Sequence, residues 1–488
     1  MALKIYNTLS RLKEEFHPIH EGKVGIYVCG PTVYGHSHVG HAKSYVSFDI
    51  IVRYLRFLGY QVRYVQNITD VGHLLGDTNE GEDRLLRASR LEQKHPMQIA
   101  EEYTRSYFED MDALGVTRPD ISPRATGHIL EQIELVEELI RKGYAYEVNG
   151  SVYFDVSKDP DYGKLSGRNT DEVESGTRVE VKSEKRHPND FALWKKAEPE
   201  HIMRWKSPWG VGFPGWHVEC SAMSMKYLGI PFDIHGGGMD NQFPHHECEI
   251  AQSEKATGKQ FVKYWIHNNL VTVGGQKMSK SLGNVILLKD LFHQYSPLVI
   301  RFFILQSHYR STLDFSDEAL SGAARGLERI TNTFRNIKTE LSKLQKESKD
   351  EPIGKGFSID INGFRNAFLE AMDDDFNTPQ AIAVLFDLGR EINSLLNEGV
   401  ANQKLLKEIE IFYQDFGGKI LGIISEKDDA YKVSDSSVME SVMQIILDIR
   451  AEIRNRKMWD LSDKIRSQLA NAGIIIEDTK DGTKWRLG

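Results

Sequence analysis

The sequence has little cysteine and lacks long apolar runs. Its three cysteines cannot all pair with one another, which favours metal or thiol chemistry over a disulfide framework. No apolar run reaches the length of about 20 residues that a membrane-spanning helix needs. The first residues, MALKIY, have no apolar segment of the signal-peptide kind. We therefore expect a cytoplasmic protein without a membrane partner.

The sequence also lacks an excess of basic residues. Its 61 Lys and Arg stand against 70 Asp and Glu, a formal net charge of −9, which argues against indiscriminate binding of nucleic acid. A local basic track remains compatible with this charge, because attraction to phosphate depends on where the cations lie. At 488 residues the chain is too long for one hydrophobic core, so we expect two to four domains.

The first half carries a pattern typical of a nucleotide-binding sheet. Residues 24–29 read VGIYVC, an apolar strand, and residues 38–41 read HVGH. A helical pattern then runs from Gly40 to Gly59, and a second strand follows at 61–70. This βαβ order places Gly40 at a helix N-terminus, where a phosphate can approach the backbone.

A second run, KMSKS at residues 277–281, follows a Gly-Gly pair late in the chain. Its two lysines suit a polyphosphate whose charge must be shared while it departs. The HVGH and KMSKS runs together predict an ATP site. They resemble the HIGH and KMSKS signatures of the class I aminoacyl-tRNA synthetases, from which the first run departs only by Val39 in place of Ile.

A metal site is predicted from residues far apart in the sequence. Cys29 follows the first strand, Cys220 lies in GWHVECSAM, and residues 244–249 read PHHECE. His245 and Glu249 would share a face if their segment were helical. Two thiolates, an imidazole and a carboxylate would make a mixed tetrahedral zinc site. The chain has no CxxC, and cysteines that merely fill the core are the alternative.

Within class I, the sequence is most similar to the cysteinyl-tRNA synthetases. The segments that carry this resemblance are 29–34 (CGPTVY), 214–223 (PGWHVECSAM), 235–238 (HGGG), 243–247 (FPHHE) and the KMSKS run. The resemblance implies that Cys29, Cys220, His245 and Glu249 are zinc ligands. Cys248, His246 and Glu247 are alternative ligands; we expect Cys248 to be a bystander and His246 to pack near the metal.

The resemblance implies two reactions. L-cysteine and ATP form cysteinyl adenylate and pyrophosphate, and cysteine then passes to the terminal adenosine of tRNA(Cys). One zinc ion per chain would select cysteine over serine, because a thiolate is a good zinc ligand and a neutral hydroxyl a poor one. The alternative is a closed structural zinc. We expect Mg²⁺ to accompany ATP.

The resemblance also assigns residues to each substrate. We expect His38 and His41 to contact the phosphates in the transition state and Lys277 and Lys280 to bind the β- and γ-phosphates as catalytic residues. The expected ATP-binding residues are Thr32, His38, Gly40, His41, Lys277, Ser279 and Lys280. The expected cysteine-binding residues are Thr69, Trp216, His235 and Asp240. For Trp216 the alternative is a core residue, and for Thr69 the end of a strand.

The C-terminal segment places basic and aromatic side chains close together, which suits phosphate contacts and stacking on unpaired bases. The residues expected to bind tRNA are Arg454, Arg456, Lys457, Trp459 and Arg466. The alternative is a solvated helix face around a core tryptophan. The resemblance of the segment from Gly473 to Trp485 to the end of these synthetases favours RNA binding.

We therefore expect an α/β Rossmann-type catalytic domain with a parallel sheet and an inserted connective subdomain, then a helical bundle and a small C-terminal anticodon-binding domain. The expected boundaries are 1–125 and 201–275 for the two halves of the catalytic domain, 126–200 for the insertion, 276–320 for the KMSKS and stem-contact region, 321–425 for the bundle, 426–440 for a linker and 441–488 for the terminal domain. We expect a monomer.

Three rival functions share some of these features. A ligase that joins cysteine to an amino sugar would use the same adenylation but lack the anticodon-binding tail. A non-catalytic RNA-binding paralogue would be expected to lose zinc ligands or signature lysines, and none is missing. A plain nucleotidyltransferase would explain the HVGH run but neither the zinc residues nor the tail.

Overall fold

The structure is a computed structural model. It describes residues 2–71, 84–168, 184–199, 201–279, 282–347, 359–398, 401–424, 435–471, 473–479 and 482–487. The chain forms two compact units, Met1–Glu426 and Lys427–Gly488, which we describe separately. Among the described residues, no helix is both long and apolar enough to span a bilayer.

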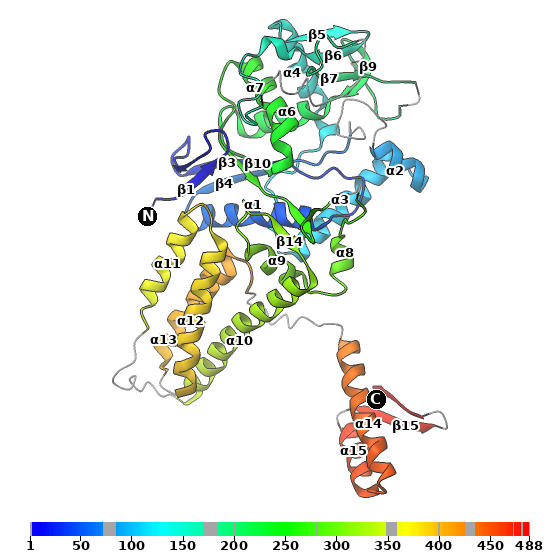
Figure 1. The fold of residues 1–488 in the computed structure, drawn as a ribbon, viewed down its shortest axis with the longest axis vertical. Helices are drawn as coiled ribbons and strands as arrows, with labels where there is room; N and C mark the ends of the chain where they lie inside the picture. The colour runs from blue at the N-terminus through cyan, green and yellow to red at the C-terminus, as the bar shows by residue number, and fades with distance from the viewer. Residues whose placement is uncertain are drawn as a thin grey trace. The chain divides into compact units, whose positions relative to one another are not determined.

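A four-stranded parallel sheet forms the centre of the first unit (Figure 1). Its order is β11-β10-β3-β4, and every neighbouring pair is parallel. Because the strands are parallel, their carboxyl ends meet at one edge, where ligands bind in open α/β sheets. The strands are β3 (Lys23–Val28), β4 (Gln61–Gln66), β10 (Phe232–Gly238) and β11 (Val262–Asn268).

Helix α1 (Val39–Phe57) connects β3 to β4, close to the predicted bounds of Gly40 to Gly59. His38 is its N-cap, and the buried Val39, Val46 and Ile50 follow the helical period, so one face packs into the core. The parallel sheet and this helix confirm the predicted nucleotide-binding βαβ unit.

A hairpin before β3 and two helices after β4 complete the first half of the sheet domain. A hairpin joins β1 (Lys4–Asn7) to β2 (Leu12–Glu15). Two helices, α2 (Arg84–Glu92) and α3 (Pro96–Ala113), follow β4, and α3 buries Ile99, Tyr107 and Met111. The Tyr107 hydroxyl donates to Gln66 Oε1 at 2.6 Å, so α3 is tied to the end of β4.

An inserted subdomain lies between the two halves of the sheet. Its antiparallel sheet has the order β5-β6-β7-β9-β8, and the β5–β6 turn is the predicted Asn149-Gly150 pair, both at positive φ. The sheet continues to Pro214, so the expected boundary at residue 200 falls inside the insertion. The elements are α4 (Ile129–Arg141), β5 (Ala145–Val148), β6 (Ser151–Phe154), β7 (Phe191–Lys196), β8 (Trp205–Ser207) and β9 (Gly210–Pro214).

Two helices carry the polypeptide back to the central sheet. They are α6 (Trp216–Leu228), before β10, and α7 (Glu247–Thr257), before β11, and they pack against each other and against α4.

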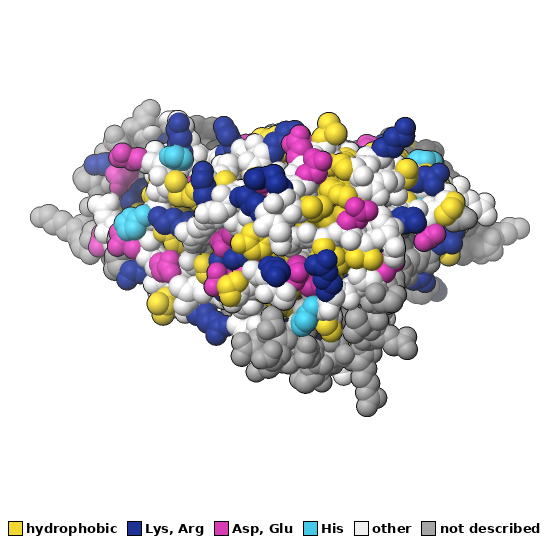
Figure 2. All heavy atoms as spheres, turned by 90° about the horizontal axis from the view of Figure 1, so that it is seen from above, with side chains coloured by type: hydrophobic (Ala, Val, Ile, Leu, Met, Phe, Trp, Pro, Cys, Tyr) yellow, Lys and Arg dark blue, Asp and Glu magenta, His cyan; other side chains and the backbone are white. Residues whose placement is uncertain are grey.

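Seen from above, the described side chains show Lys and Arg interspersed with Asp and Glu (Figure 2). This mixture agrees with the nearly balanced composition.

The KMSKS run begins at the edge of a second, smaller sheet. The expected second half of the catalytic domain, 201–275, ends in a strand outside the parallel sheet, because β12 (Val271–Val273) joins the order β13-β12-β14 instead. The partners are β13 (Gln276–Lys277), antiparallel, and β14 (Leu313–Phe315), parallel. Two short helices, α8 (Leu288–Leu291) and α9 (Pro297–Leu305), lie between β13 and β14.

A helical bundle completes the first unit, with α10 in yellow-green, α11 and α12 in yellow and α13 in orange in Figure 1. Its helices are α10 (Asp317–Glu347), α11 (Ile361–Asp373), α12 (Thr378–Glu398) and α13 (Gln403–Phe412), followed by a π-helical segment, Tyr413–Ile420. Their apolar faces share one core with α1 and α9. They lie almost entirely within the region 321–425 expected for a bundle, whose 3.6-residue apolar pattern is regular.

The second unit is small. It comprises α14 (Asp435–Asn455), α15 (Trp459–Asn471) and a hairpin of β15 (Ile474–Thr479) and β16 (Gly482–Leu487). Met443 and Leu447 of α14 pack with Ile474 and Ile476 of the hairpin. Helix α14 begins six residues before residue 441, where the terminal domain was expected to start.

Candidate active site

A cavity of about 320 Å³ lies at the carboxyl edge of the parallel sheet. It brings together most of the predicted site residues from both halves of the sheet domain and from the KMSKS hairpin. Those that line it are Cys29, Thr32, His38, Gly40, His41, Thr69, Trp216, Cys220, Asp240, His245, Glu249 and Lys277. His235 and Ser279 are not among the lining residues, and Lys280 lies outside the described residues.

The two histidines of the HVGH run hold each other at the N-terminus of α1. The backbone N–H of His38 donates to His41 Nδ1 at 3.2 Å, and that of His41 donates to His38 Nδ1 at 3.4 Å. Their rings stack with centroids 3.8 Å apart. This reciprocal cap satisfies two helix-end donors and fixes both imidazoles at the cavity wall.

Gly40 is the point at which the two signature runs meet. A Cβ atom at Gly40 would lie 3.0 Å from the His38 ring and 3.3 Å from the Met278 methyl carbon. A side chain here would therefore need both neighbours to shift. Its absence leaves the backbone at the helix N-terminus open to a phosphate.

The KMSKS run begins in the β12–β13 hairpin, whose turn residues Gly274 and Gly275 have φ of 58° and 77°. The backbone N–H of Met278 donates to Val271 O at 3.1 Å. Lys277 Nζ lies 2.9 Å from Asp240 Oδ1, and both residues line the cavity. The hairpin thus aims its first lysine into the site.

Two thiols and a carboxyl group meet at the floor of the cavity. The sulfur atoms of Cys29 and Cys220 are 3.9 Å apart, and Cys29 Sγ is 3.8 Å from Glu249 Oε1. Two Zn–S bonds of about 2.3 Å at a tetrahedral angle would place their sulfurs about 3.8 Å apart. The observed spacing therefore fits a zinc ion with little movement.

The electrostatics of this floor also favour a cation. The hydrogen bond with Cys220, together with burial, raises the pKa of the Cys29 thiol. Burial raises the pKa of the Glu249 carboxyl as well. Each anionic form is thus unfavourable unless a positive charge lies nearby, and a divalent metal would supply it. The donor set fits a metal in chemistry as well as in spacing.

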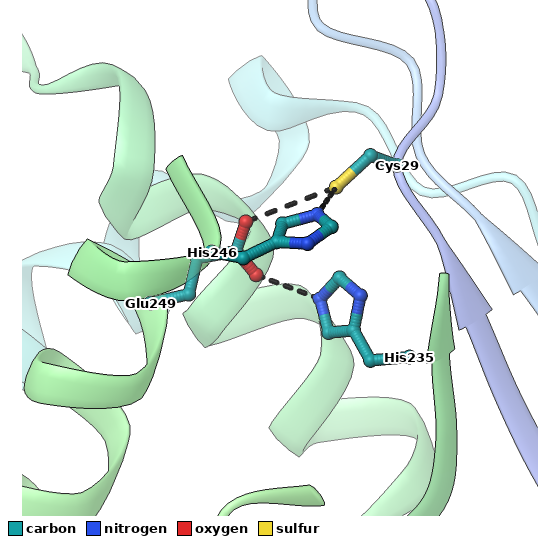
Figure 3. A group of neighbouring side chains, drawn as sticks. All are labelled: Cys29, His235, His246 and Glu249. Carbon is teal, nitrogen blue, oxygen red and sulfur yellow. Dashed lines mark hydrogen bonds and ion pairs between the residues drawn. The ribbon is translucent and has the colours of Figure 1, made fainter. Parts of the chain in front are cut away.

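The histidines around the floor are arranged differently from the prediction. His245 lies in the π-helical segment Gln242–His246, which runs directly into α7 at Glu247, and it lines the same cavity as Glu249. His245 Nδ1 lies 3.1 Å from His217 Nδ1, whereas His246 Nε2 lies 3.2 Å from Cys29 Sγ. The potential ligand atoms of Cys29, His235, His246 and Glu249 all lie within 4.8 Å of one another (Figure 3).

His235 lies behind Glu249 instead of lining the cavity. Its Nε2 atom is 2.7 Å from Glu249 Oε2, and the side chain is fully buried. Burial lowers the pKa of His235 to about 3, so the imidazole is neutral at physiological pH. His235 is therefore placed to orient the carboxyl group of Glu249, as residues behind metal ligands do.

Sequence reasoning missed two residues that hold the site together. Asn67 Oδ1 accepts the Gly30 N–H at 2.8 Å, and Asn67 Nδ2 donates to Thr69 Oγ1 at 3.0 Å. His267 Nε2 lies 2.8 Å from His246 Nδ1. Both residues follow apolar strand runs at the carboxyl edge of the sheet. That position is the signal that could have identified them.

In the second unit, Trp459 is exposed over 55% of its surface, so the alternative of a core tryptophan is wrong. The Arg454 guanidinium lies 6.0 Å from its ring centroid, near the outer limit of a cation–π contact. Arg456 pairs with Glu452, Lys457 adopts a φ of 59°, and Arg466 Nη2 donates to Ile476 O at 3.4 Å. Trp459 is thus the aromatic surface available for stacking in this group.

Comparison with known proteins decides the family. A family profile described as "tRNA synthetases class I (C) catalytic domain" matches residues 15–325, and a DALR domain profile matches residues 367–425. A cysteine–tRNA ligase from Chlorobium chlorochromatii is 57% identical over the whole of both chains. The chain belongs to the cysteine–tRNA ligase family. Another member of this family, from Deinococcus radiodurans, is 53% identical over 99% of this chain and 96% of its own.

Solved structures show that this family member has the class I synthetase fold. A Mycobacterium tuberculosis methionyl-tRNA synthetase bound to methionyl-adenylate superposes with a TM-score of 0.57 at 16% identity, over 82% of this chain and 88% of that one. A LeuRS from Agrobacterium radiobacter, in a ternary complex with tRNA, gives 0.59 at 14% identity over 84% and 85%. At these identities the likeness concerns the fold alone.

Proposed function

We propose that this chain activates L-cysteine with ATP and transfers it to the terminal adenosine of tRNA(Cys). The observation that carries the proposal is that the thiol pair Cys29 and Cys220 and both signature runs border one cavity. A site for a thiol-bearing amino acid thus adjoins a site for a polyphosphate. The 57% identity to a cysteine–tRNA ligase supports the same conclusion.

The adenylation step needs positioning and charge neutralisation more than proton transfer. The carboxylate of cysteine is already ionised at neutral pH and attacks the α-phosphorus without a general base. We assign His38 and His41 to the phosphates in the transition state, with Gly40 allowing close approach. Lys277 and Lys280 neutralise the departing β- and γ-phosphates, and Mg²⁺ accompanies ATP. Thr32 and Ser279 complete the proposed ATP-binding set.

We propose that Cys29, Cys220, His245 and Glu249 hold one zinc ion. When bound, zinc offers the substrate thiolate a coordination position that a neutral serine hydroxyl fills poorly. We retain His245 as the fourth ligand because it borders the cavity, whereas His246 is fully buried and contacts His267. His246 is the alternative ligand, since its Nε2 atom lies nearest to Cys29.

The remaining pocket residues bind the backbone of the amino acid. Asp240 supplies a carboxylate for the ammonium group, and Trp216 forms a wall of the cavity. The Trp216 ring meets the His245 ring edge-on, with centroids 4.0 Å apart, so it also fixes the proposed ligand. Thr69 also lines the cavity, beside Asn67. His235 acts through Glu249.

We propose that the bundle and the second unit bind tRNA. The exposed Trp459 ring suits stacking on an unpaired anticodon base, and the neighbouring cations suit phosphate contacts. The proposed contacts are Arg454, Arg456, Lys457, Trp459 and Arg466. We propose that the enzyme acts as a monomer.

The test is cysteine-dependent ATP–pyrophosphate exchange, with serine measured alongside, followed by charging of total tRNA. Exchange with cysteine alone, together with charging, is the expected result. Exchange without charging would favour the ligase that joins cysteine to an amino sugar. Equal exchange with serine would contradict selection through a metal–thiolate bond.

A further inference from the structure

Lys43 is a buried cation one turn into α1, two residues after His41. Only 1% of its surface is exposed. Its Nζ atom donates to Leu270 O at 3.1 Å and to Ser311 O at 2.5 Å. Burial lowers the pKa of Lys43 to about 8, because the charged ammonium group is less stable away from water. No substrate-binding role assigned above uses this residue.

The two carbonyl groups mark the start of the sheet that carries the KMSKS run. Leu270 precedes β12, and Ser311 lies two residues before β14. The Leu313 N–H donates to the same Leu270 oxygen at 3.0 Å, at the point where β12 and β14 begin to pair. Lys43 therefore joins α1 to both strands at their common origin.

A short covalent and hydrogen-bonded path leads from this contact to the ATP-binding residues. Leu270 is followed by Val271, whose carbonyl accepts the Met278 N–H at 3.1 Å. Leu270, Val271 and Met278 all border the cavity. One end of the path is thus the helix that bears His38 and His41, and the other is the hairpin that bears Lys277.

We propose that Lys43 is a positioning residue that sets the separation between the two signature runs. The inference rests on the proposed function, since it concerns where the HVGH and KMSKS residues stand when ATP reacts. A methionine at position 43 would fill a similar volume but donate no hydrogen bond to either carbonyl. The hairpin would then lose one of its links to α1 while the packing of the helix stays similar.

The experiment compares Lys43→Met with Lys43→Arg and with Lys142→Met in ATP–pyrophosphate exchange by the full chain. Lys142 is the control, because its Nζ atom also donates to a backbone carbonyl, Ala256 O at 2.6 Å, but its side chain is partly exposed and does not line the cavity. We expect Lys43→Met to lower kcat about 10- to 100-fold, the scale of a misplacement near 1 Å, with the KM for cysteine little changed. Lys43→Arg should recover most of the rate, since a guanidinium can donate to both carbonyls. Lys142→Met should keep the wild-type rate.

Thermal unfolding of each variant separates positioning from loss of fold. A Lys43→Met variant that unfolds near the wild-type temperature but exchanges slowly supports the proposal. Wild-type exchange by that variant would overturn it, as would an equal loss in Lys43→Met and Lys43→Arg. If Lys43→Met itself does not fold, Lys43→Gln replaces it, since its amide keeps an N–H donor on a shorter side chain and should give an intermediate kcat. Absence of exchange in the wild-type protein would instead contradict the proposed function.

Discussion

Lys277 Nζ and Asp240 Oδ1 form an ion pair of 2.9 Å across the mouth of the cavity. One partner belongs to the proposed polyphosphate site and the other to the proposed ammonium site. Each side chain is more than half exposed, so the pair contributes only about 0.2–1 kcal/mol. A substrate ammonium group can therefore replace Lys277 at Asp240 at little cost.

This pair predicts that an amino-acid ammonium group strengthens ATP binding. Cysteamine carries the thiol and the ammonium group, whereas 3-mercaptopropionate carries the thiol and a carboxylate. We expect cysteamine to tighten the binding of a non-hydrolysable ATP analogue about 1.4- to 5-fold by freeing Lys277, and 3-mercaptopropionate not to. Calorimetric titration measures both. The gain should vanish in Lys277→Met; a gain that persists there would mean that the added charge acts on ATP directly.

A second prediction concerns the metal. Cys220→Ser should lose most of the bound zinc and of cysteine activation while ATP binding stays near the wild-type value, because the thiolate lies at the floor and the phosphate residues at the mouth. His245→Ala and His246→Ala decide the fourth ligand. Zinc content by atomic emission should fall further in His245→Ala. A larger fall in His246→Ala would assign the buried histidine to the metal instead.

A third prediction follows from the buried ion pair of Asp49 and Arg301, which links α1 to α9. The two side chains are fully buried, and Arg301 also donates to Leu421 O at 2.7 Å. Asp49→Asn leaves Arg301 uncompensated and should cost about 3–5 kcal/mol of stability at pH 7. The control is Asp112→Asn, which breaks an exposed pair with Arg118 and should cost less than about 1 kcal/mol. Urea unfolding measures both.

The same pair gives the stability a pH dependence of known sign. Burial alone would raise the pKa of Asp49, but Arg301 and Arg53 together hold it below its ordinary value of 3.8. A carboxyl group whose pKa is lower in the folded state stabilises the fold above its unfolded pKa, and this stability is lost as pH falls through the folded-state value. The difference between wild type and Asp49→Asn should therefore be constant near neutral pH and shrink below about pH 4. A constant difference down to pH 2 would contradict this origin.

The last prediction separates the two units. Removing 427–488 should leave cysteine-dependent exchange near the wild-type rate, since every described residue that lines the cavity lies in the first unit. Charging of tRNA should weaken, because Trp459 and its neighbouring cations are lost. Trp459→Ala in the full chain is the finer test and should cost about 1–3 kcal/mol of tRNA affinity if one base stacks there. An equal loss of exchange and charging would mean that the second unit is structural.

Regular elements could be predicted from the sequence because their patterns are local. The apolar run before Cys29 and the periodic face of α1 predict β3 and α1 nearly to the residue. Asn149-Gly150 predicts its hairpin, because both residues tolerate positive φ. The sheet to which Val271–Val273 belongs could not be predicted, because a three-residue strand carries no information about its partner.

The candidate site was predicted in composition but not in its full arrangement. Cys29, Cys220 and Glu249 meet at the floor as the resemblance implied. Which of His245 and His246 lies nearer to Cys29 could not be predicted from the sequence. It depends on the π-helical turn that precedes the start of α7 at Glu247. Asn67 and Lys43 were missed because their roles depend on carbonyl and amide groups distant in the sequence.

The distribution of the proposed metal ligands along the chain bears on how the protein is made. Cys29, Cys220 and Glu249 come from three segments that only the finished sheet brings together. In it, Cys29 Sγ lies 3.9 Å from Cys220 Sγ and 3.8 Å from Glu249 Oε1. A ribosome must therefore release more than the first half of the chain before the proposed metal site can form. Any metal bound earlier would contact single thiols, which hold it weakly. Ion capture thus reports completion of the catalytic domain during biosynthesis, and a zinc-sensitive probe on stalled nascent chains would respond only once residue 249 and the strand after it have emerged.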